Sequence, residues 1–167
     1  MKACNVLLSA PLQRLKDEHM HLRAAMDHFY EITEEIEYES GPGVVQLFAK
    51  LHEQISAFNV ELKAHSKREE EGLFHLMTLR LGENDKTIQV MEEEHEKAEQ
   101  HLQDFLTEAA RAGVAIDEYD AQTITVYAVQ AYATLTQHFA KEEKALFPLA
   151  ERILSVNDMA ELEKISG

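Results

Sequence analysis

The chain has 167 residues, of which 45% are hydrophobic, so it can form an apolar core, and we expect a single domain over residues 1–167. Six glycines, three prolines and no tryptophan, in a chain with many helix-forming residues, favour an all-α fold. The formal net charge of -15 would repel phosphate groups, which argues against nucleic acid and anionic membranes as partners.

Cys4 is the only cysteine, so no internal disulfide can form, and we expect a reducing, cytoplasmic location. The sequence pattern assigns Cys4 no role. The first nine residues carry one positive charge and an apolar stretch that is too short for a secretory signal. No segment has the length and apolarity expected of a membrane span.

Apolar residues recur at intervals of three and four over residues 8–36, which predicts a first amphipathic helix. Ser9 and Pro11 are suited to begin this helix, and the sequence from Ser40 to Gly43 should end it. His19 lies within the apolar stripe of the helix. We therefore expect its imidazole to face the interior of the protein.

The same pattern predicts a second helix over residues 48–76 and a third over residues 88–109. The glycine and polar residues from Gly82 to Asp85 should end the second element and provide a cap for the third. Each of these apolar stripes also contains one histidine, His65 in the second helix and His95 in the third.

A fourth helix is predicted over residues 124–153, with Asp117 or Asp120 as its cap. Its apolar stripe contains the fourth interior histidine, His138. Pro148 lies inside this pattern, where the missing N–H and the ring should bend the helix or end it within about one turn.

Four amphipathic helices with short connections predict an up-down-up-down four-helix bundle, followed by a short C-terminal helix over residues 155–167. At a rise of roughly 1.5 Å per residue, the four histidines lie at similar distances from the first and third turns, and so at one level. At the second turn these distances differ by about seven residues. We expect a non-helical stretch between Met77 and Asp85 to absorb part of the difference.

One motif occurs twice in the stripes: a glutamate follows the histidine by four residues in His65–Glu69 and in His138–Glu142. This spacing places both side chains on one helical face, where they can bind one metal ion. Burying the two carboxylates without compensation would cost several kcal/mol for each charge, and metal coordination removes this cost. The two copies indicate two metal ions, or one site built by two helices.

His95 and Glu99 form a third copy of this spacing, so Glu99 is a further candidate ligand, although a solvated glutamate explains the position equally well. The histidines that lie off the stripes are His21, His28, His52, His75 and His101. Among them only His101 stays open as a ligand. The candidate metal ligands are therefore His19, His65, Glu69, His95, Glu99, His138 and Glu142.

These motifs make the chain similar to the hemerythrin-like, or HHE cation-binding, family. The resemblance extends from about Leu12 to Ile153 and rests on Glu18-His19, His65-x-x-x-Glu69 with Leu73-Phe74, Glu94-His95, and His138-Phe139-x-x-Glu142-Glu143-x-x-Leu146-Phe147-Pro148. It implies a four-helix bundle with a non-haem di-iron centre, in which Glu69 and Glu142 bridge two Fe ions. Zinc or manganese could replace iron in a recombinant sample.

The chain departs from the oxygen-carrying members of this family at two places. Glu99 stands where they have a second histidine, and glutamates occupy 142 and 143 where they have an aspartate five residues after the histidine. The iron–sulfur repair branch has a closer pattern of four histidines and two glutamates, but its members carry an extra N-terminal domain that contains cysteine. Neither specialised function is carried over.

Two six-coordinate ions offer about 12 positions, of which the histidines, the glutamates and a shared oxo or hydroxo group fill about ten. The open positions suit O2 or another small gas, next to an apolar wall formed by Leu22, Phe58, Leu62, Leu135 and Phe139. We expect gas binding for storage, sensing or scavenging rather than catalysis. The alternatives are a di-iron oxidase, an NO-handling or iron–sulfur-repair-type protein, and an iron sensor or store. The sequence leaves open the physiological ligand, the metal loaded in the cell, the redox partner and the oligomeric state.

Overall fold

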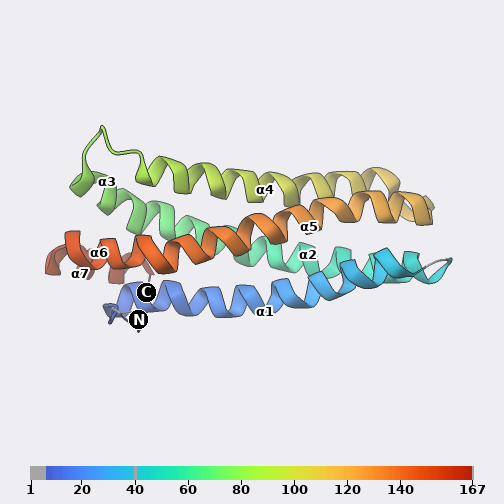
Figure 1. Ribbon diagram of the computed structural model, residues 1–167, viewed down its shortest axis with the longest axis horizontal. Coiled ribbons are helices and arrows are strands. Elements are labelled where there is room, and N and C mark those ends of the chain that lie inside the picture. Colours follow the sequence, from blue (N-terminus) through green and yellow to red (C-terminus); the bar gives the residue numbers. More distant parts are fainter. Residues whose placement is uncertain (1–6, 40, 167) are drawn as a thin grey trace, which may run out of the picture.

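The computed structural model describes residues 7–39 and 41–166, so the expectations for Cys4 and for the first six residues lie outside the described part. All the regular structure within it is helical, which confirms the all-α class. The four long helices are α1 (Ala10–Tyr38), α2 (Gly43–Arg68), α4 (Thr87–Ala112) and α5 (Glu118–Lys141). Figure 1 shows them lying lengthwise beside one another, with α1 and α4 running in the opposite direction to α2 and α5. None of the described helices is both long and apolar enough to cross a membrane.

Two of the long helices continue through a π-helical segment into a further α-helix. The elements involved are η1 (Glu69–Phe74) and α3 (His75–Leu81) after α2, and η3 (Glu142–Leu146) and α6 (Phe147–Ile153) after α5. A short 3₁₀ turn, η2 (Gly113–Ala115), lies between α4 and α5, and α7 (Val156–Ser166) is the expected C-terminal helix.

The helix ends mostly agree with the sequence signals. Ser9 precedes α1, and Pro11 lies in its first turn. The Ser9 hydroxyl does not cap the helix, because it donates a hydrogen bond of 3.0 Å to Glu151 Oε2 on α6. Asp117 caps α5, since its side chain accepts a 2.7 Å hydrogen bond from the backbone N–H of Asp120.

Pro148 does not end its helix within one turn, because α6 continues to Ile153. The change from π- to α-helix directly precedes it, and Pro148 is among the first two residues of α6. Pro148 has no N–H to donate to the preceding π-helical turn, so the change to α-helix occurs where a backbone donor is missing.

The non-helical stretch predicted between Met77 and Asp85 is wrong over its first half. α3 remains helical to Leu81 and ends at Gly82, whose φ of 90° few other residues adopt. The extra length arises because Leu76 and Met77 are buried in an apolar cluster together with residues of α6 and α7. The connection between α3 and α4 therefore begins only after Leu81, and α3 packs against α6.

The interior contains two apolar clusters that lie one after the other along the bundle. The larger cluster includes Leu22, Met26, Phe58, Leu62, Phe105 and Leu135. The smaller cluster includes Leu12, Leu15, Leu73, Phe74, Phe147 and Leu162. In α1, His19 falls between Leu15 of the smaller cluster and Leu22 of the larger one, so the polar residues of the stripes occupy the level between the clusters.

The C-terminal helix α7 is fixed to the bundle by both polar and apolar contacts. Asp158 accepts hydrogen bonds from Arg80 Nε and Nη2 at 2.8 and 2.7 Å, and from the backbone N–H of Ser155 at 3.0 Å. Ser155 Oγ accepts in return from the backbone N–H of Asp158, which completes a capping box. Leu162 is fully buried against Gly72 of η1, where an added Cβ would lie 2.8 Å from its Cδ1.

We expect Asp158→Ala to loosen α7, because the change removes the acceptor shared by Arg80 and Ser155. Hydrogen–deuterium exchange over Val156–Ser166 should become faster, and the melting temperature should fall. Arg80 lowers the pKa of Asp158, so this stabilisation is present above the ordinary aspartate pKa of about 3.9 and is lost as the pH falls below it. Glu161→Ala removes an exposed carboxylate from the same helix and is the control. Equal exchange rates in the two variants would contradict the prediction.

Candidate metal centre

Six buried side chains from the four long helices and their π-helical extensions meet between the two apolar clusters. They are His19 of α1, His65 of α2, Glu69 of η1, His95 of α4, His138 of α5 and Glu142 of η3. Their ligand atoms form two groups, and within each group they lie within 4.8 Å of one another. The first group is His19, His65, Glu69 and Glu142, and the second is Glu69, His95, His138 and Glu142. The two glutamates are therefore common to both groups.

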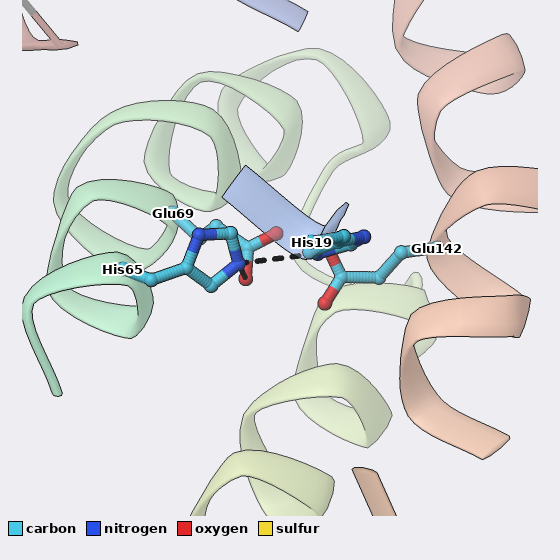
Figure 2. Close-up of side chains that lie close together, drawn as sticks. All are labelled: His19, His65, Glu69 and Glu142. Carbon is cyan, nitrogen blue, oxygen red and sulfur yellow. Dashed lines mark hydrogen bonds and ion pairs between the residues drawn. The ribbon is translucent and has the colours of Figure 1, made fainter. Parts of the chain in front are cut away.

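In the first group the two imidazoles point toward each other, as Figure 2 shows. The Nε2 atoms of His19 and His65 are 3.1 Å apart, and His65 Nε2 is 3.0 Å from Glu69 Oε1. Glu142 approaches from the opposite side, with its Oε2 3.8 Å from His19 Nε2. The two nitrogens and the two carboxylates thus face one common point.

The second group repeats this arrangement with histidines from the other two long helices. His95 Nε2 lies 3.3 Å from Glu69 Oε1 and 3.6 Å from Glu142 Oε1. His138 Nε2 contacts Glu142 Oε1 directly. Both rings are buried and their centroids are 4.5 Å apart. Each glutamate therefore reaches histidines of both groups.

Glu69 and Glu142 are each the first residue of a π-helix. A π-helical turn contains an extra residue, so it changes which of the residues that follow it in the chain face inward. Such turns are frequent at functional sites. Leu73 and Phe74 are consecutive, yet both are fully buried. The sequence analysis missed the two π-helices, although the adjacent apolar pairs Leu73-Phe74 and Leu146-Phe147 were a signal for them.

The polar atoms at the centre fit a bound cation. Within the described residues, both carboxylate oxygens of Glu69 and of Glu142 are buried, and the imidazole nitrogens of the centre are the polar groups that they face. A buried carboxylate without compensation costs several kcal/mol. Imidazole nitrogens and carboxylate oxygens together are the donor set that iron, manganese or zinc accepts. These buried acceptors are therefore those that coordination would satisfy.

The pKa values of two central histidines and of Glu142 are shifted by burial and by the neighbouring charges. Burial lowers the pKa of His95, but Glu142 and Glu69 outweigh burial and raise it to about 11. Burial also lowers the pKa of His65, while Glu69 and Glu18 raise it to about 9. Burial and the Glu69 carboxylate raise the pKa of Glu142. In the absence of metal, His65 and His95 therefore carry protons at neutral pH.

Aromatic rings surround the centre on both sides along the bundle. Phe139 stacks on His19 with ring centroids 4.2 Å apart, and its ring is 6.1 Å from that of His65. On the other side, Phe74 stacks on His95 at 5.2 Å and Phe147 on His19 at 5.6 Å. The predicted wall residues, including Phe139, are buried in the larger cluster. Phe74 and Phe147 extend the apolar surroundings to the smaller cluster.

Glu99 is not brought together with the six central side chains. It lines a surface groove with Lys63 and Glu96, and burial and the charge of Glu70 raise its pKa. Glu99 is half-buried, and α4 is α-helical through this position. A metal-binding role for Glu99 stays a prediction without support from this geometry.

The histidines predicted to lie off the stripes are all outside the centre. His21, His28, His52 and His75 are exposed, and His101 is half-buried. None of them belongs to the two donor groups found among the described residues. Acidic residues next to the candidate ligands do reach the histidines, for example Glu18 Oε1 at 3.1 Å from His65 Nδ1. The sequence analysis assigned these acidic neighbours no role.

Comparisons with known proteins identify one family. The model of the Hemerythrin HHE cation binding domain matches residues 10–150, which include all six central side chains. No curated protein and no solved structure matches the chain.

We expect Glu69→Ala and Glu142→Ala each to lose at least one metal ion per chain, because each change removes a donor common to both groups. The metal content is measured after anaerobic loading with ferrous iron and removal of the excess. Glu71→Ala, which removes an exposed carboxylate from η1, is the matched control and should keep the native content. Native metal content in both central variants would contradict the shared role.

Metal uptake should release protons at pH 7, because a metal ion binds only the neutral form of imidazole. His65 and His95, with pKa values of about 9 and about 11, must lose their protons as the ion enters. We therefore expect the apparent affinity for Zn²⁺ to rise with pH between 7 and 9. Calorimetry in buffers of different ionisation enthalpy measures the protons released. The absence of proton release at pH 7 would contradict the assignment of these two histidines as ligands.

Proposed function

The chain belongs to the hemerythrin HHE cation-binding domain family. From this premise we propose that it is a non-haem di-iron protein that binds O2 or a related small gas, for storage, sensing or scavenging. The proposal treats the chain as one domain with an up-down-up-down four-helix bundle. The observation that supports it most strongly is the pair of donor groups with Glu69 and Glu142 in common. Such a donor set suits two ions held close together by two bridging carboxylates.

The donor count supports a centre with open positions. Each group offers two imidazoles and two carboxylates, which is fewer than the six donors that an iron ion accepts. When bound, a reduced pair of iron ions supplies electrons to a small molecule such as O2 or NO at an open position. The larger part of the chain's own contribution is to place the donors and to exclude water.

The apolar surroundings favour a small uncharged ligand. Phe139 lies against His19, and Leu62 and Leu135 belong to the same buried cluster. A nonpolar wall next to an open position accommodates a diatomic gas and offers few hydrogen bonds to water or to a polar organic substrate. This contrast favours gas binding over the conversion of an organic substrate.

A surface cavity between α1 and α2 reaches the outward side of His65. It has a volume of about 280 Å³ and is lined by Leu22 and His65 on its inner side and by Glu18 and Arg68 on its outer side. His65 is buried beneath Glu18 and Arg68 at this cavity, so a small molecule that enters it lies one side chain away from the centre. The size suits a small molecule, whereas drug-sized ligands occupy pockets of about 300–1,000 Å³.

Anaerobic loading with ferrous iron should give two iron ions per chain, and exposure to air should then produce a new absorption band in the near-ultraviolet or visible range. We expect removal of O2 under vacuum to reverse the band. Glu142→Ala, which lacks one shared donor, should show neither the full iron content nor the band. The measurements are metal analysis and optical spectra on the same samples.

Other outcomes of this experiment would support other functions. Steady consumption of O2 or NO in the presence of a reductant would favour a di-iron oxidase or an NO-handling enzyme. Uptake of two iron ions without any spectral response to O2 or NO would favour an iron sensor or store. A native chain that binds no iron would overturn the proposal.

A further inference from the structure

Each of the four central histidines has a second contact, on the ring nitrogen that faces away from the centre. At three of them Nδ1 is hydrogen-bonded to a carboxylate from a different helix, and at His19 such a carboxylate lies within ion-pair distance without a hydrogen bond. The pairs are His65 with Glu18 at 3.1 Å, His95 with Glu70 at 3.1 Å, His138 with Glu94 at 3.4 Å, and His19 with Glu143 at 3.5 Å. All four Nε2 atoms are thereby left to face the carboxylates of the centre.

These contacts form a closed ring around the bundle. Glu18 on α1 reaches α2, Glu70 on η1 reaches α4, Glu94 on α4 reaches α5, and Glu143 on η3 returns to α1. Each helix thus supplies one carboxylate to the histidine of the next helix. The ring includes every helix that carries a central residue.

The position of each carboxylate follows from helix geometry. Glu18 and Glu94 precede His19 and His95, whereas Glu70 and Glu143 follow the central glutamates 69 and 142. Consecutive residues of a helix point about 100° apart, so a neighbour of an inward residue points sideways, toward an adjacent helix. Figure 1 shows that α1 and α4 run in the opposite direction to α2 and α5. On α1 and α4 the outer glutamate precedes the central residue, and after α2 and α5 it follows the central residue. Because the helix directions are also opposite, all four outer glutamates are rotated in the same sense around the bundle.

Three of the four carboxylates are also held by a cation, and that cation lies on the same helix as the histidine. Arg68 bonds Glu18 through Nε at 2.9 Å, Arg23 bonds Glu143 through Nη1 at 3.0 Å, and Lys141 bonds Glu94 at 2.9 Å. The cation follows the histidine by three or four residues in each case. At the fourth corner this position, four residues after His95, holds Glu99.

We propose that Glu18, Glu70, Glu94 and Glu143 are positioning residues that hold the imidazole of the next helix with its Nδ1 outward and its Nε2 toward the metal. A proton on Nδ1 that is donated to a carboxylate fixes the tautomer, leaves the Nε2 lone pair free and makes it a stronger donor. The inference rests on the proposed metal centre. It adds that the outer carboxylates, which are not ligands themselves, set the affinity of that centre.

The four corners should differ in how much they contribute. Replacing Glu18 or Glu143 with alanine leaves an arginine without its partner close to the bound cations, which adds electrostatic repulsion to the loss of orientation. Replacing Glu70 leaves no such cation, and its side chain is already 42% exposed. The effect of Glu70→Ala on metal affinity should therefore be smaller than the effects of Glu18→Ala and Glu143→Ala.

The test uses the full chain, metal-free and then loaded with ferrous iron under anaerobic conditions, with affinity measured by competition against a chelator. We expect Glu18→Ala, Glu70→Ala and Glu143→Ala to weaken iron binding by about 10- to 100-fold, the range typical for loss of such partners. Glu18→Gln should recover most of the affinity, because the amide oxygen can accept the same hydrogen bond from Nδ1. Glu71→Ala, next to Glu70 but not among the carboxylates that contact a central histidine, makes the same charge change and should bind iron as the native chain does.

Further measurements separate positioning from a merely structural role. On the zinc-loaded protein, ¹⁵N NMR should show the proton on Nδ1 of His65 in the native chain and in Glu18→Gln, and a changed Nδ1 signal in Glu18→Ala. An equal fall in melting temperature with and without metal, at unchanged affinity, would overturn the inference and leave the carboxylates as ordinary ion-pair partners. A native chain that binds no metal would instead overturn the proposed function itself, and this inference with it.

Discussion

Two carboxylates that are completely buried between apolar layers set the main constraint on this bundle. Within the described residues, the polar groups that face the oxygens of Glu69 and Glu142 are the imidazoles of the centre. The negative charge of a fully buried carboxylate must be compensated by a positive charge close to it. In the metal-free protein protons on the histidines provide part of the balance, which is why the pKa values of His65 and His95 are raised. Two divalent cations would replace these protons and compensate the carboxylates more completely.

The sequence was sufficient to predict the helices and the residues of the centre, because both depend on a repeat that is visible in one dimension. Apolar residues at intervals of three and four define which face is buried, and a histidine in that face has to lie near the bundle axis. His19, His65, His95 and His138 could be identified in this way. Helix propensities do not distinguish an α-helical turn from a π-helical one, so the sign of η1 and η3 in the sequence is the break in the repeat at the adjacent apolar pairs Leu73-Phe74 and Leu146-Phe147.

The wrong expectation of a non-helical stretch from Met77 arises from tertiary packing. Met77 was expected at the start of a non-helical stretch, yet α3 continues because its apolar residues pack against α6 and α7, which the local sequence does not indicate. Glu99 has the same spacing from its histidine as Glu69 and Glu142, but it lines a surface groove and belongs to neither donor group among the described residues. Spacing alone was therefore a necessary feature of a central glutamate and not a sufficient one.

The arrangement of donors also shows how the bundle is assembled from two similar halves. The hairpin of α1 and α2 supplies both histidines of the first group, and the hairpin of α4 and α5 supplies both histidines of the second. Each hairpin contributes one glutamate to both groups, so neither donor group is complete within a single hairpin. Glu70 and Glu143 cross between the hairpins in the same way, each reaching a histidine of the other half. Metal bound at this centre would therefore connect the two hairpins at the level between the two apolar clusters.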